Sequence, residues 1–415
     1  MTPPRVVVTT NGPGELMGWV RPFLRAVFAR EPGADVAIVF VPCAYATGRE
    51  PAHARTLFPR AQVIDAKAYG SFLMGRRVAG LEPRPGVLQY LGGDLFHAVT
   101  LAKRLGLQPL TYKFSKRSYR HLFLRYFALD AKNAERLRND GAPADRVRIV
   151  GNLVADAVSG SLSAFLTPAG EGSGICILPG SRAAEFSYLM PFFLATVAAI
   201  AKGLPRERFT FVISPFNTDQ ELRASVEASP DPAFGGVRGT VSDTGDAITV
   251  GDVRCAVDRS EDYRALAGCR LVITIPGTKC LEAAVLGRPM LVVLPLNRPE
   301  KIALSGIGGY LHHIPIVGAP LKARLARMVE RRFEFVAQPN IDAGQLIAPE
   351  LRGVLMPADV AAHAVALIDD PQRLRGMGQA LAGVYAAHAG AADRMAGDVL
   401  EVAANVHRLR RQAAS

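Results

Sequence analysis

The chain has 415 residues, of which 49% are hydrophobic and 7% aromatic, and its formal net charge at pH 7 is +12. This length suffices for two α/β domains, and the lack of any run of 18 uncharged apolar residues argues against a protein built of membrane-spanning helices. Five scattered cysteines, with no Cys-x-x-Cys motif and no histidine cluster at ligand spacing, argue against a disulfide framework and a structural zinc site.

The first half of the chain alternates apolar strand-like runs with helical ones. Met1 leads almost directly into a predicted strand at 5–10, which leaves no space for a signal peptide, so we expect a cytoplasmic protein. A helix is predicted around 17–30 because its apolar residues share one face. Further strands are predicted near 37–41, 62–65, 87–91, 110–114, 126–129 and 146–150, with a helix at 95–105. This rhythm predicts a parallel sheet.

The same rhythm restarts after a Gly- and Ser-rich stretch at 161–174, which we interpret as a linker. Strands are then predicted near 175–178, 209–213, 247–250, 271–274 and 290–294. The expected fold is therefore α/β, with two Rossmann-like, doubly wound domains (1–160 and 174–385) that face each other across a cleft. The last segment predicts helices, and the final one, about 390–412, is expected to pack back on the first domain.

Two turns in the first domain follow predicted strands, where ligands bind in such sheets. The first carries Asn11, Gly12, Gly14 and Glu15, but it lacks the full G-x-G-x-x-G spacing, so a tight structural turn and a binding loop are equally compatible with it. The second is Gly92-Gly93-Asp94. Asp94 fits two roles, the N-cap of the next helix and a general base that takes a proton from an attacking hydroxyl.

Two turns in the second domain combine a strand end, small residues and a helix start. In one, Gly180-Ser181-Arg182 precedes Glu185, so backbone N–H groups and an arginine could bind an anion. In the other, Gly277-Thr278 precedes Glu282, whose carboxylate could accept hydrogen bonds from ribose hydroxyls. Either turn alone would be explained by ordinary helix capping. Both in one domain favour a nucleotide diphosphate site.

Basic residues gather at Arg76-Arg77, at 113–125 and at 322–332, with large apolar residues interleaved in the second segment. This pattern suits an anionic membrane surface, and solvated helix faces explain it equally well. No nucleic-acid-binding motif accompanies it. His97 and the pair His312-His313 are possible helpers in catalysis, although such histidines are more often packed or on the surface.

The motifs of the second domain resemble one known family. Leu178-Pro-Gly-Ser-Arg-x-x-Glu185, then Gly277-Thr-x-x-Leu-Glu-Ala283, together with 151–156 and 338–351, resemble lipid-A-disaccharide synthase. The resemblance implies an inverting, metal-independent glycosyltransferase of the B type, without a cofactor, that uses a UDP-activated acylated glucosamine and a lipid-linked glucosamine phosphate. It also implies a peripheral enzyme on the cytoplasmic face of the inner membrane, and a homodimer.

The resemblance assigns the essential aspartate to Asp94 and places Asn340 beside the donor pocket. The chain departs from the family mainly in the first domain: of that family's opening motif it keeps Gly14 and an acid at Glu15, and the segment after Tyr112 has no tryptophan. Two other functions stay open. A UDP-sugar 2-epimerase would need no acceptor, and a non-catalytic nucleotide-sugar binding protein would not need Asp94.

Overall fold

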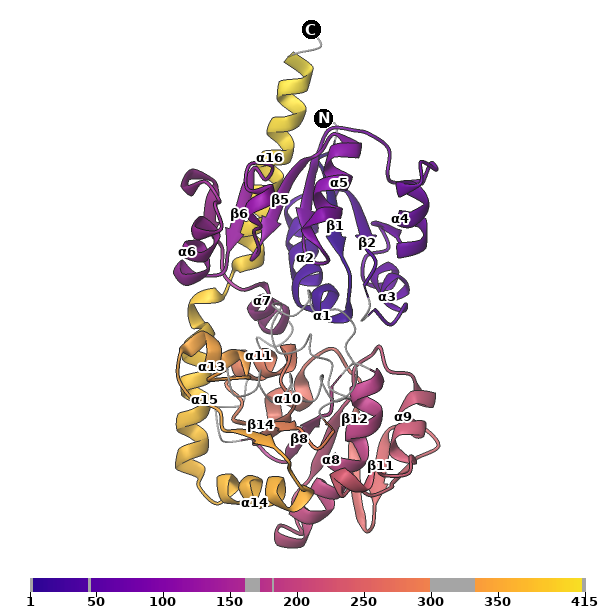
Figure 1. The fold of residues 1–415 in the computed structure, drawn as a ribbon, viewed down its shortest axis with the longest axis vertical. Helices are drawn as coiled ribbons and strands as arrows, with labels where there is room; N and C mark the ends of the chain where they lie inside the picture. The colour runs from indigo at the N-terminus through magenta and orange to yellow at the C-terminus, as the bar shows by residue number, and fades with distance from the viewer. Residues whose placement is uncertain (1–2, 44–45, 161–171, 181–182, 299–332, 413–415) are drawn as a thin grey trace. The chain divides into compact units, whose positions relative to one another are not determined.

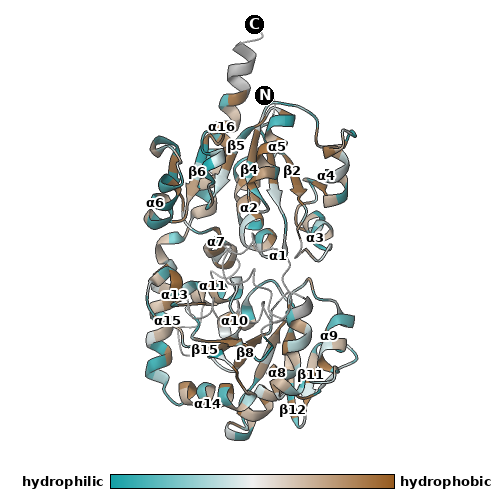
Figure 2. Ribbon diagram, viewed as in Figure 1, coloured by the Kyte–Doolittle hydropathy of each residue, from teal (hydrophilic) through white to brown (hydrophobic). Residues whose placement is uncertain are grey.

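The computed structural model describes the chain except for residues 1–2, 44–45, 161–171, 181–182, 299–332 and 413–415 (Figure 1). The chain divides into two compact units. Unit 1 consists of Met1–Gly160 and Ala387–Ser415, and unit 2 of Ser161–Ala386. Each unit contains one sheet whose strands are mainly brown, that is hydrophobic, with teal concentrated on the surrounding helices and loops (Figure 2).

Among its described residues, unit 1 forms a parallel sheet with strand order β3-β2-β1-β4-β5-β6-β7. The strands are β1 (Arg5–Thr10), β2 (Asp35–Phe40), β3 (Gln62–Ile64), β4 (Val87–Tyr90), β5 (Gln108–Tyr112), β6 (Arg125–Ala128) and β7 (Val147–Ile149). All residues of β1 are buried, as expected for a central strand covered on both faces. The strand order reverses between β1 and β4, which pair directly, with Thr9 opposite Tyr90. The segments that follow these two strands therefore leave the sheet side by side, at its topological switch point.

The helices of unit 1 are α1 (Pro13–Glu15), α2 (Arg21–Arg30), α3 (Glu50–Leu57), α4 (Ala66–Leu73), α5 (Leu95–Leu105), α6 (Ala131–Asn139), α7 (Leu153–Ser159) and α16 (Ala391–Gln412). A π-helical turn, Leu16–Val20, joins α1 to α2. The helix predicted around 17–30 thus begins earlier and contains a widened turn, a feature common at functional sites.

Specific polar contacts attach α16 to the rest of unit 1. Asp156 accepts hydrogen bonds from the backbone N–H of Gly390 (2.7 Å) and of Ala392 (2.5 Å), at the start of α16. Arg394 donates to the carbonyl of Val150 from Nε (2.9 Å) and from a terminal nitrogen (2.6 Å). These contacts give the 151–156 motif a structural purpose: its aspartate supplies an acceptor for the N–H groups at the beginning of α16.

The described residues of unit 2 form a sheet with strand order β10-β11-β12-β9-β8-β13-β14-β15. The strands are β8 (Ile175–Leu178), β9 (Phe209–Val212), β10 (Thr240–Val241), β11 (Ala247–Val250), β12 (Val253–Asp258), β13 (Leu271–Thr274), β14 (Met290–Pro295) and β15 (Glu350–Gly353). The pairs β10–β11 and β11–β12 are antiparallel, and the other pairs are parallel. The fold class is α/β, as predicted.

The helices in the described part of unit 2 are α8 (Ala183–Gly203), α9 (Asp219–Val226), α10 (Arg264–Gly268), α11 (Thr278–Val285), α13 (Gln338–Ala343), α14 (Pro357–Ile368) and α15 (Pro371–Tyr385). Within the described ranges, one stretch, Glu185–Gly203 in α8, has the length and hydropathy that a membrane span requires. That helix packs against α9 and α14, and 61% of the stretch is buried inside the protein. We therefore interpret it as a core helix of unit 2.

Candidate functional site

The two predicted turns of unit 1 lie against each other. Gly92 and Gly93 have φ angles of +138° and +88°, which non-glycine residues rarely adopt. A Cβ atom on Gly92 would lie 2.6 Å from Asn11 Oδ1 and 3.0 Å from Glu15 Cγ. The turn that follows β4 therefore packs on the loop that follows β1, and only glycine permits this approach.

The loop after β1 is compact. Gly12 is the N-cap of α1, Gly14 lies within that helix, and Glu15 ends it. The Glu15 side chain folds back toward Gly12. Its Oε2 lies 2.9 Å from the position that a Cβ atom on Gly12 would take. Asn11 donates a hydrogen bond from Nδ2 to Cys43 Sγ at 3.4 Å. The predicted loop residues thus surround the turn that carries Asp94.

Asp94 is exposed and is the N-cap of α5, where its Oδ1 accepts a hydrogen bond from the Phe96 N–H at 2.7 Å. The other carboxylate oxygen accepts no hydrogen bond from the described part of the chain. Both roles left open by the sequence are therefore compatible with one geometry: one oxygen fixes the exposed side chain at the helix start, and the other is left to accept a proton.

Tyr90 connects this turn to the sheet. Its hydroxyl donates to the carbonyl of Gly93 at 2.7 Å. Burial, and after it the negative charges of Glu15 and Asp94, raise the pKa of Tyr90 well above its ordinary value. The phenol therefore stays protonated as a hydrogen-bond donor. The carboxylates of Glu15 and Asp94 both lie near this turn.

His97, in the first turn of α5, is half-buried and lies with Nδ1 3.1 Å from the hydroxyl of Tyr69. Burial raises the pKa of Tyr69 to about 12, so this hydroxyl stays protonated at neutral pH. Burial also lowers the pKa of His97 below its ordinary value, an effect that the charge of Asp94 partly opposes. The neutral imidazole can then accept the tyrosine proton at Nδ1.

The depressed pKa of His97 predicts a loss of stability in acid. The unfolded chain binds a proton near pH 6.5 that the folded protein binds only at lower pH, so the free energy of unfolding falls as pH drops through and below 6.5. Replacement His97→Gln should flatten this fall. Urea unfolding at pH 7.5 and 5.5 measures this pH dependence of the free energy of unfolding. The fluorescence of Trp19, the only tryptophan in the chain, reports on unit 1.

His121→Gln, at an exposed histidine of the same unit, gives the comparison variant. Equal pH dependence in His97→Gln and the wild type would contradict the assignment of this effect to His97.

In unit 2 the two predicted anion-binding turns are neighbours, because β8 and β13 pair directly. Gly180 has a φ angle of +102°, and a Cβ atom there would lie 2.7 Å from Ile275 Cδ1 and 3.9 Å from Glu185 Oε2. Gly277 and Thr278 are exposed at the start of α11. Ser181 and Arg182 lie outside the described residues, as do His312 and His313. The described parts of the two turns therefore adjoin, with the N–H groups at the start of α11 in an exposed position.

Glu282 is buried and paired, a contact that the sequence analysis missed. Its Oε2 lies 2.6 Å from Nζ of Lys279, and the same ammonium lies 5.6 Å from the ring centre of Tyr263. The spacing of three residues on one helix was a visible signal for this ion pair. Ribose binding by Glu282 stays a prediction, and Lys279 joins it as a residue beside the site.

Asn340 is fully buried, and its amide is engaged within the chain. Its Oδ1 accepts from the N–H of Ile347 (3.0 Å) and of Ala348 (2.9 Å), and its Nδ2 donates to Ala348 O and to Glu350 Oε1, both at 2.8 Å. This arrangement holds the segment before β15 against α13. Asn340 therefore supports the local structure, and direct contact with a donor stays a prediction.

Two of the predicted basic segments have contrasting surroundings. Arg76 and Arg77 are exposed and follow Met74, which is 74% exposed, at the end of α4. In the segment 113–125 the largest apolar residues are partly or fully buried, with Phe123 only 1% exposed, and Leu122 is the exception at 49%. The segment 322–332 lies outside the described residues.

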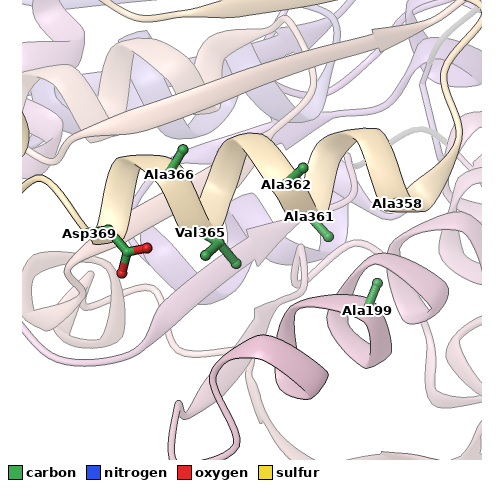
Figure 3. A pocket seen from close by; sticks show the side chains of 7 residues that line it. All are labelled: Ala199, Ala358, Ala361, Ala362, Val365, Ala366 and Asp369. Atoms are coloured by element: carbon green, nitrogen blue, oxygen red, sulfur yellow. The ribbon is translucent and has the colours of Figure 1, made fainter.

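A groove of about 480 Å³ lies between α8 and α14 in unit 2 (Figure 3). Its lining consists of Ala199, Ala358, Ala361, Ala362, Val365, Ala366 and Asp369. Ala199 lies sixteen residues after the start of α8, about 24 Å along the helix from that start. The groove is thus remote from the candidate site and offers one charged group. Within the described ranges, no group of three or more His, Cys, Asp or Glu residues could hold a metal ion.

No protein-family model matches the chain. The solved structures that it resembles include a UDP complex of MnaA from S. aureus, with a TM-score of 0.60 and 13% identity over 97% of each chain. They also include a UDP-GlcNAc 2-epimerase from Neisseria meningitidis bound to UDP-GlcNAc, with a TM-score of 0.57 and 14% identity over 96% of this chain and 100% of that one. These likenesses place the chain in the class of two-domain, Rossmann-like α/β folds.

Curated proteins with similar sequences come from one family. The chain is 24% identical to lipid-A-disaccharide synthase of Geobacter metallireducens over 264 residues, 62% of this chain and 57% of the relative. It is 25% identical to that of Pseudomonas aeruginosa (strain UCBPP-PA14) over 256 residues, 60% of this chain and 54% of the relative. The chain thus spans a little over half the length of these relatives. The chain is thus distantly similar in sequence to lipid-A-disaccharide synthases, the family that its motifs resemble.

Proposed function

We propose that the protein is a glycosyltransferase that moves a sugar of the N-acetylglucosamine or acylated glucosamine type from a UDP-sugar to a lipid-linked acceptor. The observation that carries this proposal is Asp94: an exposed carboxylate, fixed by a helix N-cap at the switch point of unit 1, beside a glycine turn. The family relationship and the likeness to UDP-bound structures support the donor class.

In the proposed reaction the acceptor binds unit 1 and the donor binds unit 2. Asp94 accepts the proton of an acceptor hydroxyl, whose oxygen attacks the anomeric carbon while the bond to UDP breaks. A single displacement inverts the configuration at that carbon. The N–H groups at the start of α11 would stabilise the charge that develops on the diphosphate, without a metal ion. By its place in the motif, Arg182 would bind the same group.

Unit 1 would also hold the enzyme at a membrane. Met74 and Phe96, 74% and 52% exposed, provide apolar side chains, and Arg76 and Arg77 provide charges that suit anionic lipid. We infer a peripheral position on the cytoplasmic face of the inner membrane. The proposal of a homodimer rests on the family resemblance.

The alternative is a UDP-sugar 2-epimerase, which the likeness to epimerase structures favours. Proton NMR of UDP-N-acetylglucosamine with the full chain separates the two, in the absence and presence of membrane lipid extract. A transferase releases UDP only when lipid is present. A new sugar-nucleotide signal without lipid would overturn the proposal in favour of epimerisation, and no turnover in either sample would leave only nucleotide-sugar binding.

A further inference from the structure

One lysine of unit 2 lies where helix electrostatics disfavour a positive charge. Lys279 is the second residue of α11, and its side chain is 34% exposed. A cation in the first turn of a helix opposes the helix dipole, which is already positive at that end. The motif Gly277-Thr-x-x-Leu-Glu-Ala283 leaves the position open to any residue. Neither helix formation nor the motif therefore explains why a lysine is found here.

Two contacts fix the ammonium group of Lys279. Its Nζ lies 2.6 Å from Oε2 of Glu282 and 5.6 Å from the ring centre of Tyr263. Tyr263 has a φ of +60°, and Lys113 has the one other positive value among the described non-glycine residues, +68°. Aromatic residues rarely adopt such a backbone conformation, and residues strained in this way cluster at functional sites. A strained tyrosine from a separate segment thus helps to hold the lysine against Glu282.

The ion pair determines what the Glu282 carboxylate can do. The side chain of Glu282 is 6% exposed, and an ionised carboxylate so deeply buried is stable only when it is paired. Lys279 supplies the opposite charge and occupies Oε2. The other oxygen, Oε1, accepts no hydrogen bond within the described residues. The pair therefore leaves one oxygen of an ionised carboxylate to accept hydrogen bonds from a ligand.

We propose that Lys279 is a positioning residue for the donor nucleotide: its ammonium keeps Glu282 ionised and oriented, so that Oε1 accepts hydrogen bonds from the ribose hydroxyls. The site then selects ribonucleotides, because a nucleotide without these hydroxyls leaves a charged acceptor unpaired. Lys279 acts through Glu282 in this inference and does not bind the diphosphate itself. The inference rests on the proposed function for the donor class, and its binding test does not depend on turnover.

The test is a calorimetric titration of the full chain, without acceptor, with UDP and with its 2′,3′-dideoxy analogue. We expect the wild type to bind UDP about tenfold or more tightly than the analogue. Lys279→Met should reduce this ratio to less than about threefold, because the carboxylate loses the charge that keeps it ionised. Lys279→Arg keeps a cation beside Glu282 and should preserve the ratio. Lys202→Met, at an exposed lysine in the last turn of α8, is the matched control and should bind both nucleotides like the wild type.

A double variant shows whether Lys279 acts through Glu282. Glu282→Gln alone should lose the preference for UDP, and the further change Lys279→Met should lower it no more. The double variant removes both charges of the pair together, so it leaves no buried charge unpaired.

Three results would overturn the inference alone. A ratio near one in the wild type would mean that the site does not recognise ribose. An unchanged ratio in Lys279→Met, with both nucleotides bound more weakly, would mean that the ammonium binds the diphosphate directly. A ratio that rises in Lys279→Met would mean that the ammonium competes with ribose for Glu282. Ribose selectivity without any transfer to lipid would overturn the proposed transferase alone, and no binding of UDP would overturn both.

Discussion

Replacement of Asp94 by asparagine is expected to lower the rate of sugar transfer by about 10²–10⁴-fold, the usual contribution of a general base. The same change should leave stability almost intact. Asparagine caps helices as well as aspartate does, so it can still accept the hydrogen bond that Oδ1 receives from Phe96. The variant thus removes the base and keeps the cap. Initial rates with UDP-sugar and lipid, together with thermal unfolding, measure the two effects separately.

Asp65 provides the control, because it caps α4 in the same unit with a hydrogen bond from Ala68 at 2.8 Å. Asp65→Asn should keep both stability and activity. Asp94→Ala should lose activity and also about 1 kcal/mol of stability, since alanine cannot cap. Full activity in Asp94→Asn would show that this residue only caps its helix, and would remove the observation on which the proposed transfer depends.

Removal of the Glu350 carboxylate is expected to destabilise unit 2 by about 3–5 kcal/mol, as loss of one partner from a buried ion pair does. Its side chain is 2% exposed and pairs with Arg352. Its Oε1 also accepts from the N–H of Ala337 (2.8 Å) and from Asn340 Nδ2 (2.8 Å). Glu350→Ala removes the carboxylate partner of the guanidinium, which keeps the carbonyls of Phe333 and Glu334, and takes one acceptor each from the Ala337 N–H and from Asn340 Nδ2. Scanning calorimetry measures the shift.

Glu227, an exposed glutamate of the same unit, serves as the comparison. Glu227→Ala should change the free energy of unfolding by less than about 0.5 kcal/mol. A similar small change in Glu350→Ala would mean that water replaces the lost carboxylate, and that the segment before β15 does not depend on this contact.

The fold class followed from the sequence because buried parallel strands leave a strong signal. A run such as Arg5–Thr10, whose six residues are all buried, is continuous rather than alternating, and helical runs separate such strands. The strand β12 (Val253–Asp258), which pairs antiparallel with β11 and parallel with β9, was not predicted. Most of its side chains are partly or fully exposed, so burial imposes less pattern on it.

The sequence predicted the individual residues of the candidate site but not how they are arranged in space. The sequence placed Asn11 and Asp94 after separate strands. Their proximity depends on the pairing of β1 with β4, which chain order alone does not determine. The positive φ of Lys113 was also beyond prediction, because contacts from Asn133 and Arg136, twenty or more residues further along, hold it. Tertiary structure here overrides the local preference of a lysine.

The transfer of labelled sugar into lipid tests the proposed activity directly. The full chain is incubated with UDP-N-acetylglucosamine labelled in the sugar, together with membrane lipid extract, and the label is counted in the organic phase. We predict that the wild type moves label into that phase with one UDP released per sugar, and that Asp94→Asn moves about 10²–10⁴-fold less. Label that stays in the aqueous phase as an epimer would contradict glycosyl transfer, and equal transfer by both proteins would contradict the role of Asp94 as the base.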